Sequence, residues 1–206
     1  MNIGIVGSNG YLGETLKSFF SLSHKIVPLK LRIDNNSDLV NFNLKSMIDM
    51  HKLDVIVNCA AIIGFINCYK NAKKAYFVNS ILPHLICSVC KNLNVKYYHI
   101  STEAVFPSGD LNSLYSETDI PNPETVYGKS KYIGEQTIIN FNNSTIIRLP
   151  RLFGWGSQIV YNLYQKIQNN EKIKVSTDLF STPVHIILVA EEILKIIEKN
   201  KISKYG

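Results

Sequence analysis

Short runs of β-branched and other apolar residues alternate along the chain with stretches in which apolar residues recur at helical spacing. The apolar runs predict five buried strands, at 3–6, 25–31, 54–58, 95–100 and 145–149. The stretches between them predict helices, at 11–21, 45–51, 72–92 and 126–141. Strand and helix in this alternation are typical of the α/β class with a doubly wound parallel sheet. A segment rich in Pro, Ser, Asn and Asp, 106–124, predicts an irregular surface loop before the last helix.

The composition agrees with a folded domain. The chain has 206 residues, of which 46% are hydrophobic, and a mean hydropathy of +0.03, so we expect one domain with a well-buried core. No apolar stretch approaches the roughly 20 residues that span a bilayer, and the chain start lacks a basic signal-peptide region. We therefore expect a cytoplasmic protein with no membrane partner.

The formal charge of +6 and the pI near 9.0 raise the question of nucleic-acid binding. The basic residues are scattered, and Lys73 and Lys74 are the only adjacent pair, so a basic stripe is lacking and we expect no nucleic-acid partner. A cofactor and a substrate that both carry phosphates account for a mild basic excess through electrostatic steering. Simple solubility is the alternative that stays open.

Four cysteines include one CxxC pair, Cys87 and Cys90. Because no second pair completes a tetrahedral site, we expect no metal. The pair lies inside a mostly apolar helical stretch rather than at the exposed helix start that a redox thiol needs. We interpret both thiols as packing residues.

The first predicted strand runs directly into a GxxGxxG turn, residues 7–13, that opens a helix. The first glycine permits a tight turn, the second lets the backbone approach a pyrophosphate, and the third allows close helix packing. Phosphate then lies at the positive end of the helix. The turn predicts a dinucleotide site, with a glycine turn that binds no ligand as the alternative; its residues are Gly7, Asn9, Gly10, Tyr11, Leu12 and Gly13.

The end of the second predicted strand indicates which dinucleotide is bound. An NAD enzyme places an acidic residue there to hold the ribose 2′-hydroxyl, whereas this chain has Lys30 and Arg32. Both cations can pair with a 2′-phosphate, which favours NADP(H) over NAD(H). Ordinary solvated loop charges are the alternative.

Tyr127 and Lys131 stand four residues apart at the start of a predicted helix, so their side chains project from one face. Reduction of a ketone by hydride needs a proton for the developing alkoxide. A phenol, with an ordinary pKa of about 10, becomes a better proton shuttle when an ammonium stabilises its phenolate. Ser101 and Thr102 end the fourth strand, where one of them could bond a substrate carbonyl or merely cap its own backbone.

Together these sequence motifs resemble the extended short-chain dehydrogenases/reductases, and most closely the dTDP-4-dehydrorhamnose reductase family. The resemblance covers nearly the whole chain and follows one order. It rests on 7–13, 54–61, 78–79, 99–102, 126–131 and 181–183.

The resemblance implies that NADPH delivers hydride to the C4 ketone of a nucleotide-linked 6-deoxy-4-keto sugar. Tyr127 would donate the proton, Lys131 would lower the Tyr127 pKa and bind the nicotinamide ribose, and Thr102 would orient the carbonyl. Asn79 would brace the active-site helix. The further cofactor-binding residues that it implies are Asn58, Cys59, Ala60 and Ala61 after the third strand, Asp38 and Leu39 near adenine, and Ser101. It also implies an NADP-binding domain over 1–150 and a partial substrate-binding region over 151–206, with a helix that returns to the first domain.

The chain departs from the family on the substrate side. Glu103-Ala104 follows Thr102 where family members commonly have Asp-Tyr, and Arg151 stands in place of a substrate-side aromatic residue. Thr102, Glu103 and Arg151 are the expected substrate residues, with Arg151 either clamping a sugar-nucleotide phosphate or serving as a structural ion-pair partner. Family members continue well beyond residue 206, so a fragment and a minimal form are both open, with an incomplete substrate pocket.

Two alternatives to the reductase remain. An epimerase or dehydratase of the same fold would use bound cofactor transiently. A non-catalytic NADP-binding regulatory subunit would keep the fold while it assists another enzyme. A homodimer is also open, because many such enzymes dimerise through helices.

Overall fold

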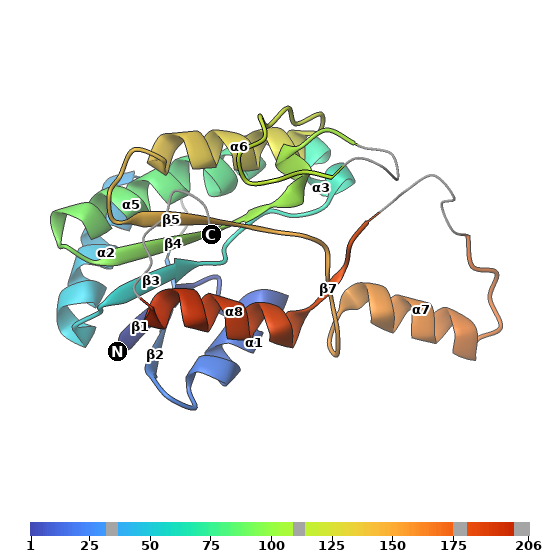
Figure 1. Ribbon diagram of the computed structural model, residues 1–206, viewed down its shortest axis with the longest axis horizontal. Coiled ribbons are helices and arrows are strands. Elements are labelled where there is room, and N and C mark those ends of the chain that lie inside the picture. The colour runs from blue at the N-terminus through green and yellow to red at the C-terminus, as the bar shows by residue number, and fades with distance from the viewer. Residues whose placement is uncertain (32–36, 109–113, 175–180, 200–206) are drawn as a thin grey trace.

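A computed structural model describes residues 1–31, 37–108, 114–174 and 181–199, with residues 37–42 described as backbone only. Its centre is a parallel five-stranded sheet in the order β2-β1-β3-β4-β5 (Figure 1). The strands are β1 (Asn2–Val6), β2 (Lys25–Leu29), β3 (Val55–Asn58), β4 (Lys96–Thr102) and β5 (Ser144–Leu149). The expected doubly wound α/β class is confirmed.

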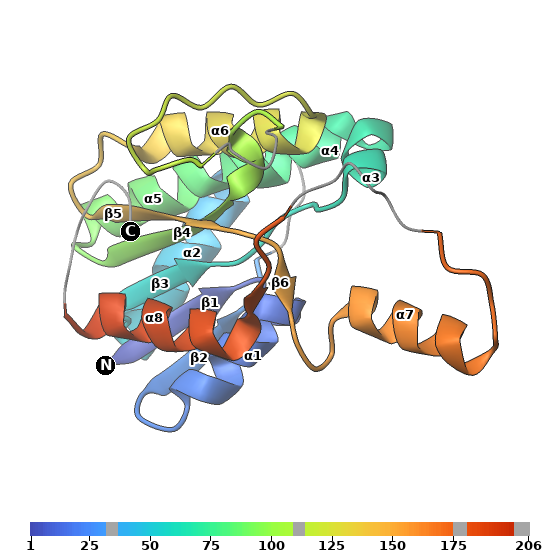
Figure 2. The same cartoon turned by 45° about the vertical axis from the view of Figure 1, so that its right-hand side comes forward.

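Helices cover both faces of this sheet (Figures 1 and 2). One face carries α1 (Tyr11–Phe20) and α8 (Ile186–Glu198), which pack on each other and on the strands through an apolar cluster. The opposite face carries α2 (Ser37–His51), α5 (Leu82–Asn92) and α6 (Val126–Ile138). The interior strands β1 and β3 read as apolar runs because both of their faces are buried.

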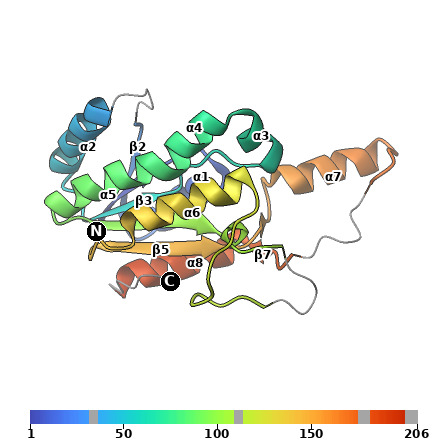
Figure 3. The same ribbon diagram turned by 90° about the horizontal axis from the view of Figure 1, so that it is seen from above.

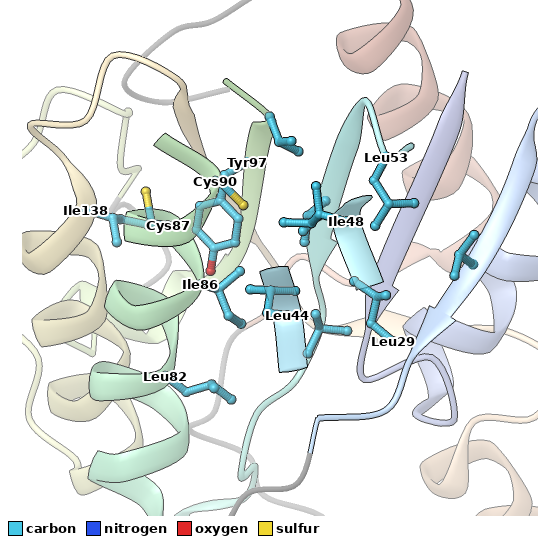
Figure 4. Close-up of a cluster of buried hydrophobic side chains, with 14 of the residues drawn as sticks. Leu29, Leu44, Ile48, Leu53, Leu82, Ile86, Cys87, Cys90, Tyr97 and Ile138 are labelled. Atoms are coloured by element: carbon cyan, nitrogen blue, oxygen red, sulfur yellow. The ribbon is translucent and has the colours of Figure 1, made fainter. Parts of the chain in front are cut away.

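The apolar cluster on the face covered by α2, α5 and α6 contains both cysteines of the CxxC motif (Figure 4). Cys87 and Cys90 are fully buried among Leu82, Ile86 and Ile138, and both are free thiols. Burial raises the pKa of the Cys87 thiol to about 12. The interpretation of this CxxC as packing residues therefore agrees with the structure.

The helical stretch 72–92 holds a local irregularity that the apolar periodicity did not predict. It comprises α4 (Ala72–Tyr76), a π-helical turn η1 (Phe77–Ile81) and α5. A π-turn inserts an extra residue into a helix and is frequent at functional sites. Here it carries Asn79, whose fully buried side chain contacts α6.

Several elements lie outside the predicted pattern. They are α3 (Phe65–Lys70), η2 (Glu103–Val105), β6 (Leu152–Phe153), α7 (Gln158–Gln168) and β7 (Val184–His185). β6 and β7 pair in parallel as a separate two-stranded sheet. In the loop expected over 106–124, the structure describes 106–108 and 114–124, and no helix or strand occurs in these two pieces.

Helix α7 extends away from the sheet in all three views (Figures 1 to 3). None of its residues is buried, although Ile159, Leu163 and Ile167 recur at helical spacing on it. Their exposed fractions are 58%, 44% and 56%. Along the described parts of the chain, no helix combines the length and apolar character that crossing a bilayer requires.

Candidate active site

The strand order reverses between β1 and β3, and open α/β sheets bind their ligands at the carboxyl ends of the strands at such a point. The chain segments after these strands meet there. Cys59 donates its backbone N–H to the Val6 carbonyl at 2.9 Å, and Gly7 has a φ of 75°. A Cβ on Gly7 would lie 2.6 Å from the Ala60 nitrogen, so only glycine permits this approach. The predicted residues Gly7, Cys59 and Ala60 therefore share one edge.

The start of α1 presents free backbone donors at this edge. Gly10 is the N-cap residue and provides no side-chain cap, and the first intrahelical bond runs from the Glu14 N–H to the Gly10 carbonyl at 2.8 Å. The N–H groups of residues 11–13 therefore lie at the positive helix end without intrahelical partners. A Cβ on Gly10 would approach only the Gly7 oxygen, at 3.4 Å. This open, positively polarised surface, with the exposed Asn9 beside it, fits a pyrophosphate.

The Tyr11 side chain turns toward the small second sheet. Its hydroxyl oxygen would lie 3.2 Å from a Cβ on Gly154, directly after β6. Among the described residues this buried hydroxyl has no hydrogen-bond partner, and burial raises its pKa. Tyr11 therefore has its backbone, rather than its ring, available to a phosphate.

The residues predicted to bind the 2′-phosphate and the adenine are described only in part. Lys30 is exposed, one residue beyond β2. Arg32 lies outside the described residues, and Asp38 and Leu39 lie in α2 within the part described as backbone only. Their roles stay predictions.

Tyr127 and Thr102 are brought together from α6 and β4. The Thr102 hydroxyl faces the phenol and lowers the Tyr127 pKa, but the larger effect of burial leaves that pKa above its ordinary value. Thr102 Oγ1 also accepts the Ala104 N–H at 3.2 Å. Of the two roles left open for Thr102, the structure shows the backbone cap, and the bond to a substrate carbonyl stays a prediction.

Lys131 lies one helical turn from Tyr127 and is 1% exposed. Its Nζ donates to the Ile100 carbonyl at 2.5 Å and lies 3.2 Å from His99 Nε2. Burial lowers the Lys131 pKa to about 8, while the charge of Glu135 opposes the shift. The ammonium is held at the end of β4, on the same helix face as the phenol.

Close packing fixes the start of α6. Thr125 caps the helix by accepting the Gly128 N–H at 3.0 Å. Gly128 lies against the 103–105 turn, where an added Cβ would come 2.1 Å from the Ala104 carbonyl oxygen. The Asn79 amide donates to Ser130 Oγ at 2.9 Å and bonds both backbone groups of Ile62. Asn79 therefore ties the chain after β3 to α6.

A buried carboxylate joins α6 to two strands, and the sequence pattern did not single it out. Glu135 is fully buried, accepts the Ser101 hydroxyl and pairs with Arg148 at 2.7 Å. Arg148 also lies over the Phe106 ring, 5.1 Å from its centroid. Ser101, a predicted cofactor residue, thus directs its hydroxyl to Glu135. Helical spacing could have indicated it, because Glu135 follows Tyr127 by eight residues and Lys131 by four and therefore lies on the same helix face.

The predicted substrate residues Glu103 and Arg151 are neighbours. Burial raises the Glu103 pKa, and the nearby Arg151 backbone and charge partly oppose this shift. Arg151 itself is exposed. Phe65 on α3 was not predicted, yet its ring centroid lies 6.4 Å from that of Tyr127.

A parallel sheet with a glycine turn at its reversal point, and a Tyr–Lys pair beside a strand-end hydroxyl, defines the class of dinucleotide-dependent oxidoreductases. Within this class the chain belongs to the RmlD substrate binding domain family, whose model matches residues 1–205. This membership confirms the family expected from the sequence.

Individual relatives agree with this membership. The chain is 29% identical over 195 residues to the spore coat polysaccharide biosynthesis protein SpsK of Bacillus subtilis (strain 168), covering 93% of this chain and 68% of the relative. It is 30% identical over 208 residues to a dTDP-4-dehydrorhamnose reductase of Aggregatibacter actinomycetemcomitans, covering 98% and 70%. A dTDP-4-dehydrorhamnose reductase from Bacillus anthracis str. Ames, solved in complex with NADP, matches with a TM-score of 0.87 and 27% identity, covering 100% of this chain and 72% of that one.

Proposed function

We propose that this protein catalyses the NADPH-dependent reduction of the C4 ketone of a nucleotide-linked 6-deoxy-4-keto sugar, in deoxysugar or polysaccharide synthesis. The observation that carries the proposal is the grouping of Tyr127, Lys131 and Thr102 at the carboxyl end of β4. The named reductases among the relatives support it, as does the NADP complex of a structural neighbour. The Tyr-x-x-x-Lys arrangement also supports a short-chain dehydrogenase/reductase assignment.

The cofactor would be held at the carboxyl ends of β1 and β3. The α1 start would bind the pyrophosphate, Lys30 and Arg32 the 2′-phosphate, and Lys131 the nicotinamide ribose. When bound, NADPH supplies the hydride. The other residues proposed to line it are Asp38, Leu39, Cys59, Ala60, Ala61, Asn79 and Ser101.

The residues of the chain would then transfer one proton to the substrate. Thr102 binds the C4 carbonyl oxygen and holds it against the phenol, and Tyr127 donates its proton as that oxygen gains negative charge. Because the Tyr127 pKa is raised, the phenol is protonated at neutral pH and ready to donate. The Lys131 ammonium stabilises the phenolate that remains. Glu103 and Arg151 would face the rest of the substrate.

The expected division into a cofactor-binding domain over 1–150 and a partial substrate region over 151–206 is also a proposal. It is supported by α8, which follows the β6–β7 sheet and packs back on α1. The cytoplasmic location and the homodimer stay predictions.

The proposal can be tested with NADPH and NADH against dTDP-, UDP- and GDP-linked 4-keto-6-deoxy sugars, measuring nucleotide binding by fluorescence and oxidation by absorbance. We expect stoichiometric NADPH oxidation with at least one sugar nucleotide. Turnover that requires only catalytic NADP, with no net oxidation, would identify an epimerase instead. Tight NADPH binding without turnover on the whole panel would favour the regulatory subunit.

A further inference from the structure

A chain of buried polar side chains leads from the active-site lysine into the core. Lys131 Nζ lies 3.2 Å from His99 Nε2, and His99 Nδ1 lies 3.5 Å from the Tyr97 hydroxyl and 3.4 Å from Asn58 Nδ2. Asn58 in turn donates to the Tyr97 hydroxyl at 2.9 Å. His99, Tyr97 and Asn58 are each fully buried. The function proposed above gives no role to His99, although it contacts the lysine directly.

We propose that His99 is a positioning residue for Lys131: its neutral imidazole accepts a hydrogen bond from the lysine ammonium through Nε2 and holds that charge at the end of β4. The inference deepens the proposed function, because it rests on the role given there to Lys131. It assigns one imidazole tautomer, with the proton on Nδ1.

The surroundings of the ring favour this neutral form. His99 is shut off from water, and burial together with the Lys131 charge holds its pKa well below the ordinary value. With Nε2 accepting from the ammonium, Nδ1 carries the ring proton, and the Tyr97 hydroxyl oxygen at 3.5 Å is the acceptor in its reach. Asn58 Nδ2 lies 3.4 Å from the same nitrogen but has a shorter bond to the Tyr97 hydroxyl, at 2.9 Å, to which we assign its proton. The Tyr97 ring stacks on the imidazole at 6.2 Å with an interplanar angle of 19°. Tyr97 therefore fixes the orientation of the imidazole from the side opposite Lys131.

Few other groups compensate the buried ammonium. Ile100 provides one carbonyl acceptor. Glu135, one turn along α6, supplies a negative charge but directs its oxygens to Ser101 and Arg148. Cys59, after β3, has a thiol whose pKa burial raises to about 12, so it is neutral. Among the described groups near Lys131, His99 thus supplies a second acceptor that favours the charged form.

The first test uses the unaltered protein. Long-range proton–nitrogen correlation NMR distinguishes the two ring nitrogens of a histidine by whether each carries a proton. At neutral pH we expect His99 to have a bare Nε2 and a protonated Nδ1, and to stay neutral in mildly acidic solution. A proton on Nε2 would overturn the proposal, because that nitrogen could not then accept from the ammonium.

The second test follows the lysine itself, with lysine labelled by carbon-13 at Cε and the Lys131 signal assigned by its loss in Lys131→Met. His99→Phe keeps an aromatic ring against Tyr97 but removes both nitrogens, whereas His99→Gln retains a polar acceptor. We expect the titration midpoint of Lys131 to fall by about one pH unit in His99→Phe, because hydrogen bonds to charged groups are the strong ones. His99→Gln should return it toward the wild-type value.

The matched control is His24→Gln, which replaces a histidine paired with Glu198 at the end of α8 and should leave the Lys131 midpoint in place. An unchanged midpoint in a folded His99→Phe would overturn the proposal. If that variant does not fold, the tautomer in the unaltered protein decides. Neither measurement needs turnover, so failure of the proposed reductase activity would be seen separately, as absent NADPH oxidation beside a normal tautomer and titration.

Discussion

Substitution of Gly128 by alanine tests whether the positions of Tyr127 and Thr102 depend on the close packing of α6 against the 103–105 turn. A Cβ at this position would lie 2.1 Å from the Ala104 carbonyl oxygen and 3.0 Å from Pro123 Cβ. To reach the 3.4 Å at which ordinary contact begins, the helix and the 103–105 turn must separate by more than 1 Å. The turn cannot move alone, because the Ala104 N–H is bonded to Thr102 Oγ1.

Tyr127 and Thr102 lie on the two sides of the gap that must open, so their hydroxyls should part. A misplacement of about 1 Å can cost roughly 100-fold in rate, and we expect a loss of that order in kcat for NADPH oxidation. Overpacking of this kind also costs about 1–3 kcal/mol of folding free energy, which thermal unfolding would record as a lower Tm. Lys129→Ala, an exposed neighbour on the same helix, is the control and should behave as wild type. Wild-type kcat in Gly128→Ala would show that the seating of α6 does not control the placement of these hydroxyls.

Three further substitutions address single groups of the site. Tyr127→Phe removes the proton donor, so kcat should fall by at least about 100-fold while fluorescence titration shows unchanged NADPH affinity; unchanged turnover would remove Tyr127 from the chemistry. Burial lowers the Lys131 pKa to about 8 from 10.5. Between pH 8 and pH 10.5 the unfolded state therefore binds more protons at this group than the folded state does. The contribution of Lys131 to the free energy of unfolding must then rise with pH over this range. Chemical denaturation of wild type and Lys131→Met should show this gain, up to about 3 kcal/mol, in the wild type alone; a constant difference between the two proteins across the range would contradict it. The variant is needed as a reference because buried thiols act in the opposite direction above pH 9. Glu135→Gln breaks a buried ion pair with Arg148, and we expect a loss of about 3 kcal/mol in the free energy of unfolding. In the Glu135→Gln variant, a further Arg148→Met substitution should lower the free energy of unfolding by less than it does in the wild type. Strictly additive losses would show that the two residues are not coupled.

The central fold was predictable because its interior strands β1 and β3 are buried on both faces and therefore read as apolar runs, between stretches with helical periodicity. α3 is too short to show a period, and α7 has helical periodicity but buries none of its residues. The glycine turn and the Tyr–Lys pair are local in sequence, so their spacing alone places them.

The supporting groups depend on distant contacts and could not be predicted in this way. Glu135 meets Ser101, 34 residues earlier, and Arg148, 13 residues later. His99 meets Lys131 across 32 residues. Such pairs arise only once the order of β3, β4 and β5 is known, and no local period indicates them.

One helix face supplies three groups to the end of β4, with Tyr127 at Thr102, Lys131 at Ile100 and Glu135 at Ser101. Each residue added to an α-helix rotates the later residues by about 100° around the helix axis. A single insertion or deletion between positions 127 and 135 would therefore swing one or two of these side chains off the strand. Point substitutions remove the three groups one at a time, whereas a change in length displaces every group that follows it: Lys131 and Glu135 together if it precedes Lys131, and Glu135 alone if it follows.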